Sequence, residues 1–188
     1  MGWDAGVVVG IIGIVIATAA LVMAIPPFLD LVCGKPSIRL SFADSAEQGA
    51  KFLLGRIDNR PIMSAFLKAM GITRADARVF ATFDIREHGT NKILASSFRA
   101  KLTDSASHED GLTLTLQAPL PLVFVIVRHD DKGATAINHA PSEEQILSLS
   151  PGEYFAEASV GFHGGVVVNK KSLTISPNKD ATCWNFRT

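Results

Sequence analysis

An uncharged apolar run from Val7 to Ile25 constrains this chain more than any other feature of its sequence. Its 19 residues include eleven Val, Ile or Leu side chains. As a helix the run is about 28 Å long, close to the thickness of a bilayer's hydrocarbon core. Pro26 and Pro27 then end the helix, because proline lacks a backbone N–H and restricts the residue before it. The run predicts a single transmembrane helix, with Trp3 at one interface.

A cleaved secretory signal is the alternative interpretation, because Val22, Met23 and Ala24 have the small-residue spacing of a cleavage site. A signal peptide, however, carries Lys or Arg before an apolar run of about 7 to 15 residues. This run is longer, and no basic side chain precedes it. Both mismatches favour a retained anchor, so residues 1–34 are interpreted as a transmembrane anchor with a short linker.

Basic residues near the ends of the run predict its orientation in the lipid bilayer. Lys35 and Arg39 follow it closely, whereas the only charged side chain before it is Asp4. Positive residues stay on the cytoplasmic side of single-pass proteins. We therefore expect a cytoplasmic C-terminal domain, and an extracytoplasmic domain is the alternative.

Small residues recur within the run at alternating spacings of four and three. Such spacing places them on one helical face and lets a second backbone approach closely. This face predicts a homo-oligomer or pairing with another membrane helix, although Gly and Ala are also common in membrane helices generally. The helix-packing candidates are Gly6, Gly10, Gly13, Ala17, Ala20 and Ala24.

The chain as a whole has no net charge and few cysteines. The 18 basic and 18 acidic residues cancel, so nothing attracts nucleic acid electrostatically. Cys33 and Cys183 are the only cysteines, too few for a disulfide-stapled secreted scaffold. We expect both to be free thiols and expect no nucleic-acid partner.

Beyond Gly34 the apolar pattern changes from a helical period to alternation, which is typical of β-strands. The clearest alternating run is LTLTLQ, residues 112–117. The pattern predicts a mainly β domain over residues 35–176, an antiparallel sandwich of about eight strands. Residues 177–188 then form a C-terminal tail outside the domain, and a flexible tail is one of the conformations that fit this prediction. Strands are expected in residues 37–42, 52–57, 79–86, 92–102, 112–117, 122–127 and 154–160.

Two short helices are expected to interrupt the strands. Residues 61–70 begin with Pro61, place apolar side chains on one side and precede Gly71 in the usual stop position. Ser142 and Gln145 have the spacing of a capping box before Ile146. The sequence therefore predicts one helix at 61–70 and one turn of helix after residue 142.

The stretch from Leu149 through Pro151 and Gly152 to Tyr154 resembles the tyrosine corner of immunoglobulin-like and fibronectin-type sandwiches. The resemblance implies an immunoglobulin-like sandwich in which Tyr154 is buried and its hydroxyl bonds to backbone in the preceding connection. Ala156 stands where antibody domains have their second cysteine. The layout of one anchor and one sandwich is similar to uncharacterised single-pass membrane proteins of prokaryotes, and this similarity implies no activity.

Motifs of catalysis or metal binding are not found. The five histidines lack the H-x-H, H-x-x-x-H and H-E-x-x-H spacings, and we expect them to be solvated loop residues. Neither a G-x-S-x-G elbow nor a phosphate-binding loop occurs. We expect no catalytic residue, no cofactor and no metal. The histidines are His88, His108, His129, His139 and His163.

Three functions fit these observations. A membrane-tethered, non-enzymatic interaction module, whose sandwich binds an unknown protein partner, requires no further feature. A subunit of a larger membrane complex, held through the small-residue helix face, is the first alternative. An enzyme whose catalytic residues come together only in the folded chain is the second.

Overall fold

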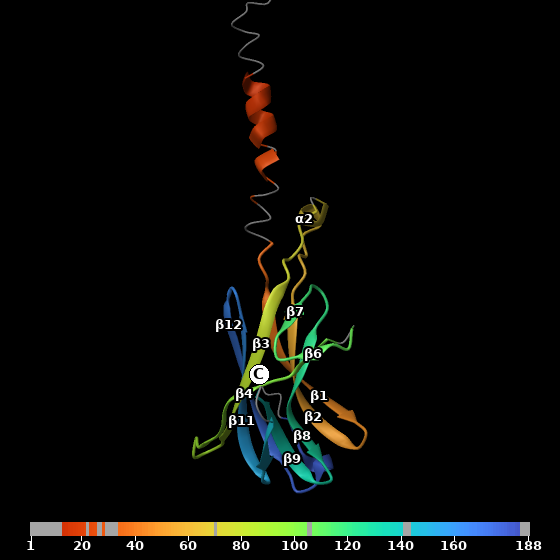
Figure 1. The fold of residues 1–188 in the computed structure, drawn as a ribbon, viewed down its shortest axis with the longest axis vertical. Helices are drawn as coiled ribbons and strands as arrows, with labels where there is room; N and C mark the ends of the chain where they lie inside the picture. The colour runs from red at the N-terminus through yellow and green to blue at the C-terminus, as the bar shows by residue number, and fades with distance from the viewer. Residues whose placement is uncertain are drawn as a thin grey trace, which may run out of the picture. The chain divides into compact units, whose positions relative to one another are not determined.

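The computed structural model describes residues 13–21, 23–25, 28, 34–69, 71–104, 107–140 and 144–184 (Figure 1). Contacts divide the chain into two compact units. The smaller unit is Met1–Lys35 with Pro61–Ala75, and the larger is Pro36–Arg60 with Asp76–Thr188. Residues 61–75, which the sequence assigned to the 35–176 domain, therefore group with the N-terminal segment.

The smaller unit contains helical residues at 13–21, 23–25 and 28 and the short helix α2, Ala65–Ala69. Within the described ranges, no helix combines the length and apolarity that crossing a bilayer demands. Residues 7–12 and 22 of the expected span lie outside those ranges, and the transmembrane helix stays a prediction. Of the helix expected at 61–70, only Ala65–Ala69 in its C-terminal half is helical in the described residues, whereas residues 61–64 are not, and Gly71 has a φ of 75°.

The larger unit consists of two antiparallel sheets (Figure 1). The seven-stranded sheet has the order β1-β2-β8-β5-β6, and β9 pairs with both β8 and β10. Its strands are β1 Ile38–Glu47, β2 Ala50–Asn59, β5 Leu102–Asp104, β6 Asp110–Gly111, β8 Leu122–Asp130, β9 Gly133–His139 and β10 Glu144–Leu149.

The second sheet has five strands in the order β12-β11-β3-β4, with β7 also paired to β3. Its strands are β3 Ala77–Glu87, β4 Ile93–Arg99, β7 Leu114–Leu116, β11 Gly152–Phe162 and β12 Gly165–Ile175. The mainly β antiparallel sandwich is therefore confirmed. The described part of the chain has twelve strands, whereas the sequence predicted about eight.

Two predicted elements are wrong. The single strand expected at 92–102 is split, because Ala100 and Leu102 are buried where the chain crosses from β4 to β5 in the other sheet. The helix expected after residue 142 is instead β10, which pairs with β9 along its whole length. Pairing with the edge of β9 satisfies the backbone hydrogen-bonding groups of this segment and accompanies the burial of Leu149. One turn of helix would leave most of these groups without a partner.

The core lies between the two sheets, where alternate residues of each strand point inward. On β3 these are Val79, Ala81, Phe83 and Ile85, as the sequence predicted. On the neighbouring strand β11, Ala158 lies opposite Phe83 in the ladder. A large side chain beside a small one fills the space at the density of a protein interior.

The sandwich has two ends, which we name by the path of the chain. At the proximal end β1 begins, β2 ends and the β11–β12 hairpin turns. At the distal end lie the β1–β2 and β8–β9 turns and the 3₁₀ helix η1, Lys179–Ala181. Thr182 and Trp184 are buried, and the backbone of Cys183 forms an isolated antiparallel β-bridge with that of Thr174. The fold thus continues to Trp184 instead of ending at residue 176.

Candidate binding surface

The corner predicted from the sequence lies at the distal start of β11. Tyr154 is buried, and its hydroxyl donates a hydrogen bond of 2.7 Å to the carbonyl oxygen of Ser150. Pro151 and Gly152 make the connection between these two residues, and the Tyr154 ring packs against Gly152. Burial raises the pKa of Tyr154, and the negative charge of Glu87 adds to the effect. The burial and the backbone bond expected for Tyr154 are both present.

The helix-packing candidates fall partly within the described chain. Gly13, Ala17, Ala20 and Ala24 are helical and exposed. A Cβ added at Gly13 would meet no atom within 4 Å. Gly6 and Gly10 lie outside the described residues, and pairing through this face stays a prediction.

An exposed apolar strip runs across the outer face of the five-stranded sheet near the proximal end. Phe80 on β3, Gly161 on β11 and Val166 on β12 are direct neighbours across the ladders. Side chains opposite one another in a ladder point to the same face. One row further along, Val168 takes the corresponding position on β12. Phe80, Val166 and Val168 are 51%, 66% and 54% exposed.

The Phe80 ring lies against Gly161. A Cβ at this position would overlap the ring, so any other residue would force the ring to move. The other sheet repeats the arrangement, with the Phe124 ring packed over Gly55. Phe124 is buried in the core, however, whereas half of Phe80 faces solvent. The same cross-strand contact therefore fills the core in one sheet and presents an aromatic ring to solvent in the other.

A notch opens in the edge of the sheet beside Phe80. The ladder between β3 and β4 ends where Arg99 lies opposite Thr82. The ladder between β3 and β7 begins only at Val79. The gap between β4 and β7 is a hollow of about 480 Å³. Its lining combines apolar side chains, one guanidinium group and three hydroxyls. The residues include Phe80, Thr82, Ser97, Arg99, Leu112 and Thr113. The hollow can accept an apolar side chain and offers Arg99 to an acidic one.

A second, more polar hollow of about 610 Å³ shares Thr113 with the notch. Its lining includes Arg78 and two acidic residues, Asp104 and Glu109. Ser107 donates a hydrogen bond of 2.6 Å to Asp104. Charges of both signs thus stand at the proximal end, next to the apolar strip.

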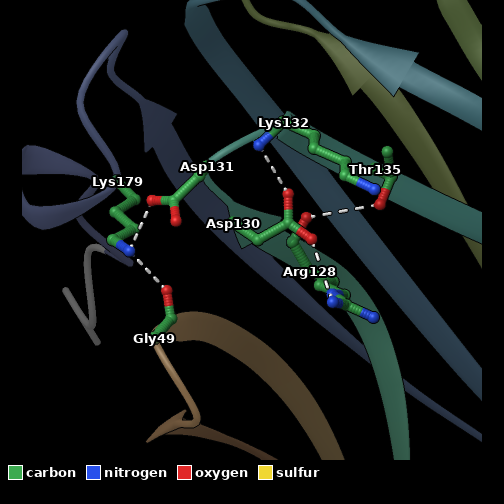
Figure 2. Close-up of polar contacts among 7 residues, drawn as sticks. All are labelled: Gly49, Arg128, Asp130, Asp131, Lys132, Thr135 and Lys179. Carbon is green, nitrogen blue, oxygen red and sulfur yellow. Dashed lines mark hydrogen bonds and ion pairs between the residues drawn. The ribbon is translucent and has the colours of Figure 1, made fainter.

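The distal end carries a network of polar contacts instead (Figure 2). The ammonium of Lys179 donates 2.6 Å hydrogen bonds to the carbonyl of Gly49 and the carboxylate of Asp131. The bond to Asp131 raises the pKa of Lys179. The backbone N–H of Lys132 donates to Asp130 and lowers the pKa of that carboxyl. These contacts join η1 to the β1–β2 and β8–β9 turns.

A buried pair lies beneath this network. The Nδ1 atom of His129 is 2.6 Å from the hydroxyl of Thr182, and both side chains are buried. The Thr182 hydroxyl also accepts a hydrogen bond from the backbone N–H of Ser176. Lys51 donates to the carbonyl oxygens of Asp180 and Thr182. Burial lowers the pKa of His129, and the positive charges of Lys51 and Lys179 lower it further, against the opposing effect of Asp130.

His129 contradicts the expectation of solvated loop histidines, since it lies inward on β8. The signal was its position two residues after the buried Val127, on the inward side of a strand that continues to Asp130, beyond its predicted end at Val127. The strip was missed because its residues come from three strands, and only their register brings them together. Cys183 is a free, exposed thiol as expected, and Cys33 lies outside the described residues.

Groups of three or more metal-ligand side chains are not found within the part of the chain that the structure describes. Comparison with known proteins finds no family model and no curated protein that matches the chain.

Proposed function

We propose that this chain is a membrane-tethered interaction module whose β-sandwich binds a protein partner through the proximal strip. The apolar run Val7–Ile25 supports the tether, since nineteen uncharged residues favour insertion into a bilayer. Tethering confines the sandwich to the membrane and raises its effective concentration for a partner located there. The module is non-enzymatic in this proposal.

The observation that carries the proposal is the apolar strip with the notch beside it. Phe80, Val166 and Val168 are large and exposed, and strand register gathers them on one face of the five-stranded sheet. Other exposed apolar residues, such as Ile146 on β10 of the other sheet, lie apart from this strip. Contiguous apolar surface rimmed by polar groups is typical of protein-binding sites. An aromatic ring beside a small hollow is the usual form of a binding hot spot.

Photocrosslinking in native membranes tests the strip. A benzoylphenylalanine placed at Phe80 in the full-length chain should give a discrete heavier adduct. The same group at Ser148, exposed on β10 of the other sheet, serves as the control and should give none. The combined changes Val166→Thr and Val168→Thr keep the side-chain shape, remove apolar surface and should abolish the adduct. Adducts of equal yield at both positions, or none at either, would overturn the proposal.

We propose that the sandwich faces the cytoplasm, following Lys35 and Arg39 at the C-terminal side of the run. The exposed thiol of Cys183 is a built-in probe of orientation, once Cys33 is replaced by serine. A membrane-impermeant maleimide should modify Cys183 in lysed cells and leave it unmodified in intact cells. Modification without lysis establishes the extracytoplasmic alternative.

Two finer assignments are part of the proposal. The hydroxyl bond of Tyr154 to Ser150 supports an immunoglobulin-like sandwich. The exposed face of Gly13, Ala17, Ala20 and Ala24 supports pairing with another helix in the membrane. Ala17→Ile should weaken helix association in an energy-transfer assay, whereas Val15→Ile, off this face, should not.

A further inference from the structure

The segment Pro61–Ala75, here called the 61–75 hook, has a composition unlike that of the sandwich. It contains no acidic residue, whereas Lys68 and Arg74 are basic. Its apolar residues are large and closely spaced: Ile62, Met63, Phe66, Leu67, Met70 and Ile72. Basic and apolar side chains without acidic ones are the composition of segments that bind the surface of anionic membranes.

The hook is locally well formed although α2 has only five residues (Figure 1). The hydroxyl of Ser64 accepts a hydrogen bond from the N–H of Leu67 at the start of the helix. At its end Gly71 donates to the carbonyl of Lys68, and Ile72 donates to that of Leu67. This pair of bonds is a Schellman motif, which requires the positive φ that Gly71 adopts. The hook therefore has a defined shape, capped at both ends.

The apolar side chains of the hook that the structure describes differ in burial. Ile62 and Ile72 are 6% and 3% exposed, whereas Met63 is 82% exposed. Lys68 is exposed as well and lies in the last turn of α2. A long, unbranched apolar side chain and an ammonium group are thus presented to the surroundings on one small element.

The base of the hook is bonded to the residues that follow the apolar N-terminal run. The N–H of Ala75 donates a 2.6 Å hydrogen bond to the carbonyl of Gly34, and the guanidinium of Arg74 donates one of 2.8 Å to that of Lys35. Only eight residues separate Gly34 from Ile25, the last residue of the run. Even fully extended they span at most about 30 Å. The hook is thereby held within a short distance of the point where the run would leave the bilayer.

We propose that the 61–75 hook is a second membrane contact, which inserts Met63 among the lipid acyl chains and directs Lys68 to anionic headgroups. This inference rests on the proposed membrane tether. So short an element binds lipid weakly by itself, but the tether supplies a high effective concentration of membrane surface.

Fluorescence quenching in vesicles tests the inference on the full-length chain, with Cys33 and Cys183 replaced by serine. Proteins carrying a polarity-sensitive thiol probe at Met63→Cys, Val15→Cys or Lys92→Cys are reconstituted into phosphatidylcholine–phosphatidylserine vesicles. Lys92, exposed at the β3–β4 turn of the distal end, is the control for a residue in water. The Met63 probe should emit at shorter wavelength than the Lys92 probe. It should also be quenched several-fold more strongly by lipids that are spin-labelled near the headgroup.

The result at Val15 separates failure of the hook from failure of the tether. A Val15 probe quenched from deep in the bilayer, together with a water-like Met63 probe, overturns the hook and leaves the tether standing. Water-like signals at both positions overturn the tether and the hook together. Lys68→Glu should shift the Met63 probe toward a water-like signal in anionic vesicles, whereas Lys92→Glu should not. Equal signals for these two charge variants would overturn the headgroup contact.

Discussion

The two ends of the sandwich differ in how their surface groups are satisfied. At the distal end, Lys179, Lys51 and the His129–Thr182 pair bond to backbone and side chains of the same chain. At the proximal end, Phe80 and Val168 are exposed, and Phe80 lines an open notch. Polar groups that are bonded internally hold a fold together, whereas contiguous apolar groups left in water favour binding a partner. The difference is consistent with a structural role for the distal end and supports the proposal that the proximal end binds a partner.

Replacing an aromatic residue at each end provides the largest test of this comparison. Trp184→Ala removes a buried core side chain at the distal end and should lower the free energy of unfolding by about 3–5 kcal/mol. Phe80→Ala at the proximal end should cost much less, because half of that ring is already in solvent. Urea denaturation of the full-length chain in detergent measures both. Equal losses would mean that the strip is part of the core.

A second test compares two threonines. Thr182→Val keeps the side-chain shape but removes the hydroxyl that pairs with His129 and accepts from Ser176. Leaving buried polar groups without a partner should cost about 1–3 kcal/mol. Thr113→Val, at the exposed edge of the notch, should change stability by no more than about 0.5 kcal/mol. A neutral Thr182→Val would show that the buried pair does not hold the C-terminal segment.

The tyrosine corner predicts a smaller effect. Tyr154→Phe removes the hydroxyl that donates to Ser150 and should destabilise the fold by about 1 kcal/mol, the usual contribution of one such bond. Thermal unfolding of the two proteins at one pH measures the loss. An unchanged midpoint would mean that the corner contributes no stability at the distal end.

The smallest effect is a pH dependence that originates at the distal end. Because the pKa of His129 is lowered in the folded chain, the unfolded chain binds a proton more readily below its ordinary pKa of 6.5. The stability from neutral His129 is complete above pH 6.5 and declines as the pH falls through the lowered folded pKa. Unfolding followed from neutral pH to about pH 5 should therefore show a steeper decline than in His129→Gln. Parallel curves would show that His129 is not the group responsible.

Much of the fold could be predicted from the sequence because period-2 alternation is a local signal. The inward side of β3 and the burial of Tyr154 follow from spacing and turn chemistry alone. The predicted helix after residue 142 failed for a non-local reason. Its capping-box spacing was a valid local signal, but the free edge of β9 provides Glu144–Leu149 with a full ladder of backbone bonds. Tertiary pairing therefore overrode a weak local preference.

The proximal strip could not be predicted, because Phe80 is far from Gly161 and Val166 in the sequence and becomes their neighbour only through strand register. A single exposed valine or phenylalanine is unremarkable, and only contiguity gives it meaning. The same holds for His129 and Thr182, which are 53 residues apart in the sequence and meet only in the folded chain.

The sequence by itself determined the mainly β architecture, the uncharged apolar run before it and the corner at Tyr154. Each of these depends on residues that are adjacent or regularly spaced along the chain, where backbone geometry directly converts spacing into position. Only the tertiary structure decided strand order, the crossing from β4 to β5, the incorporation of residues 177–184 into the fold and the place of the apolar strip. These depend on which distant segments pack together, and that choice is set by the combined burial and hydrogen bonding of the whole chain.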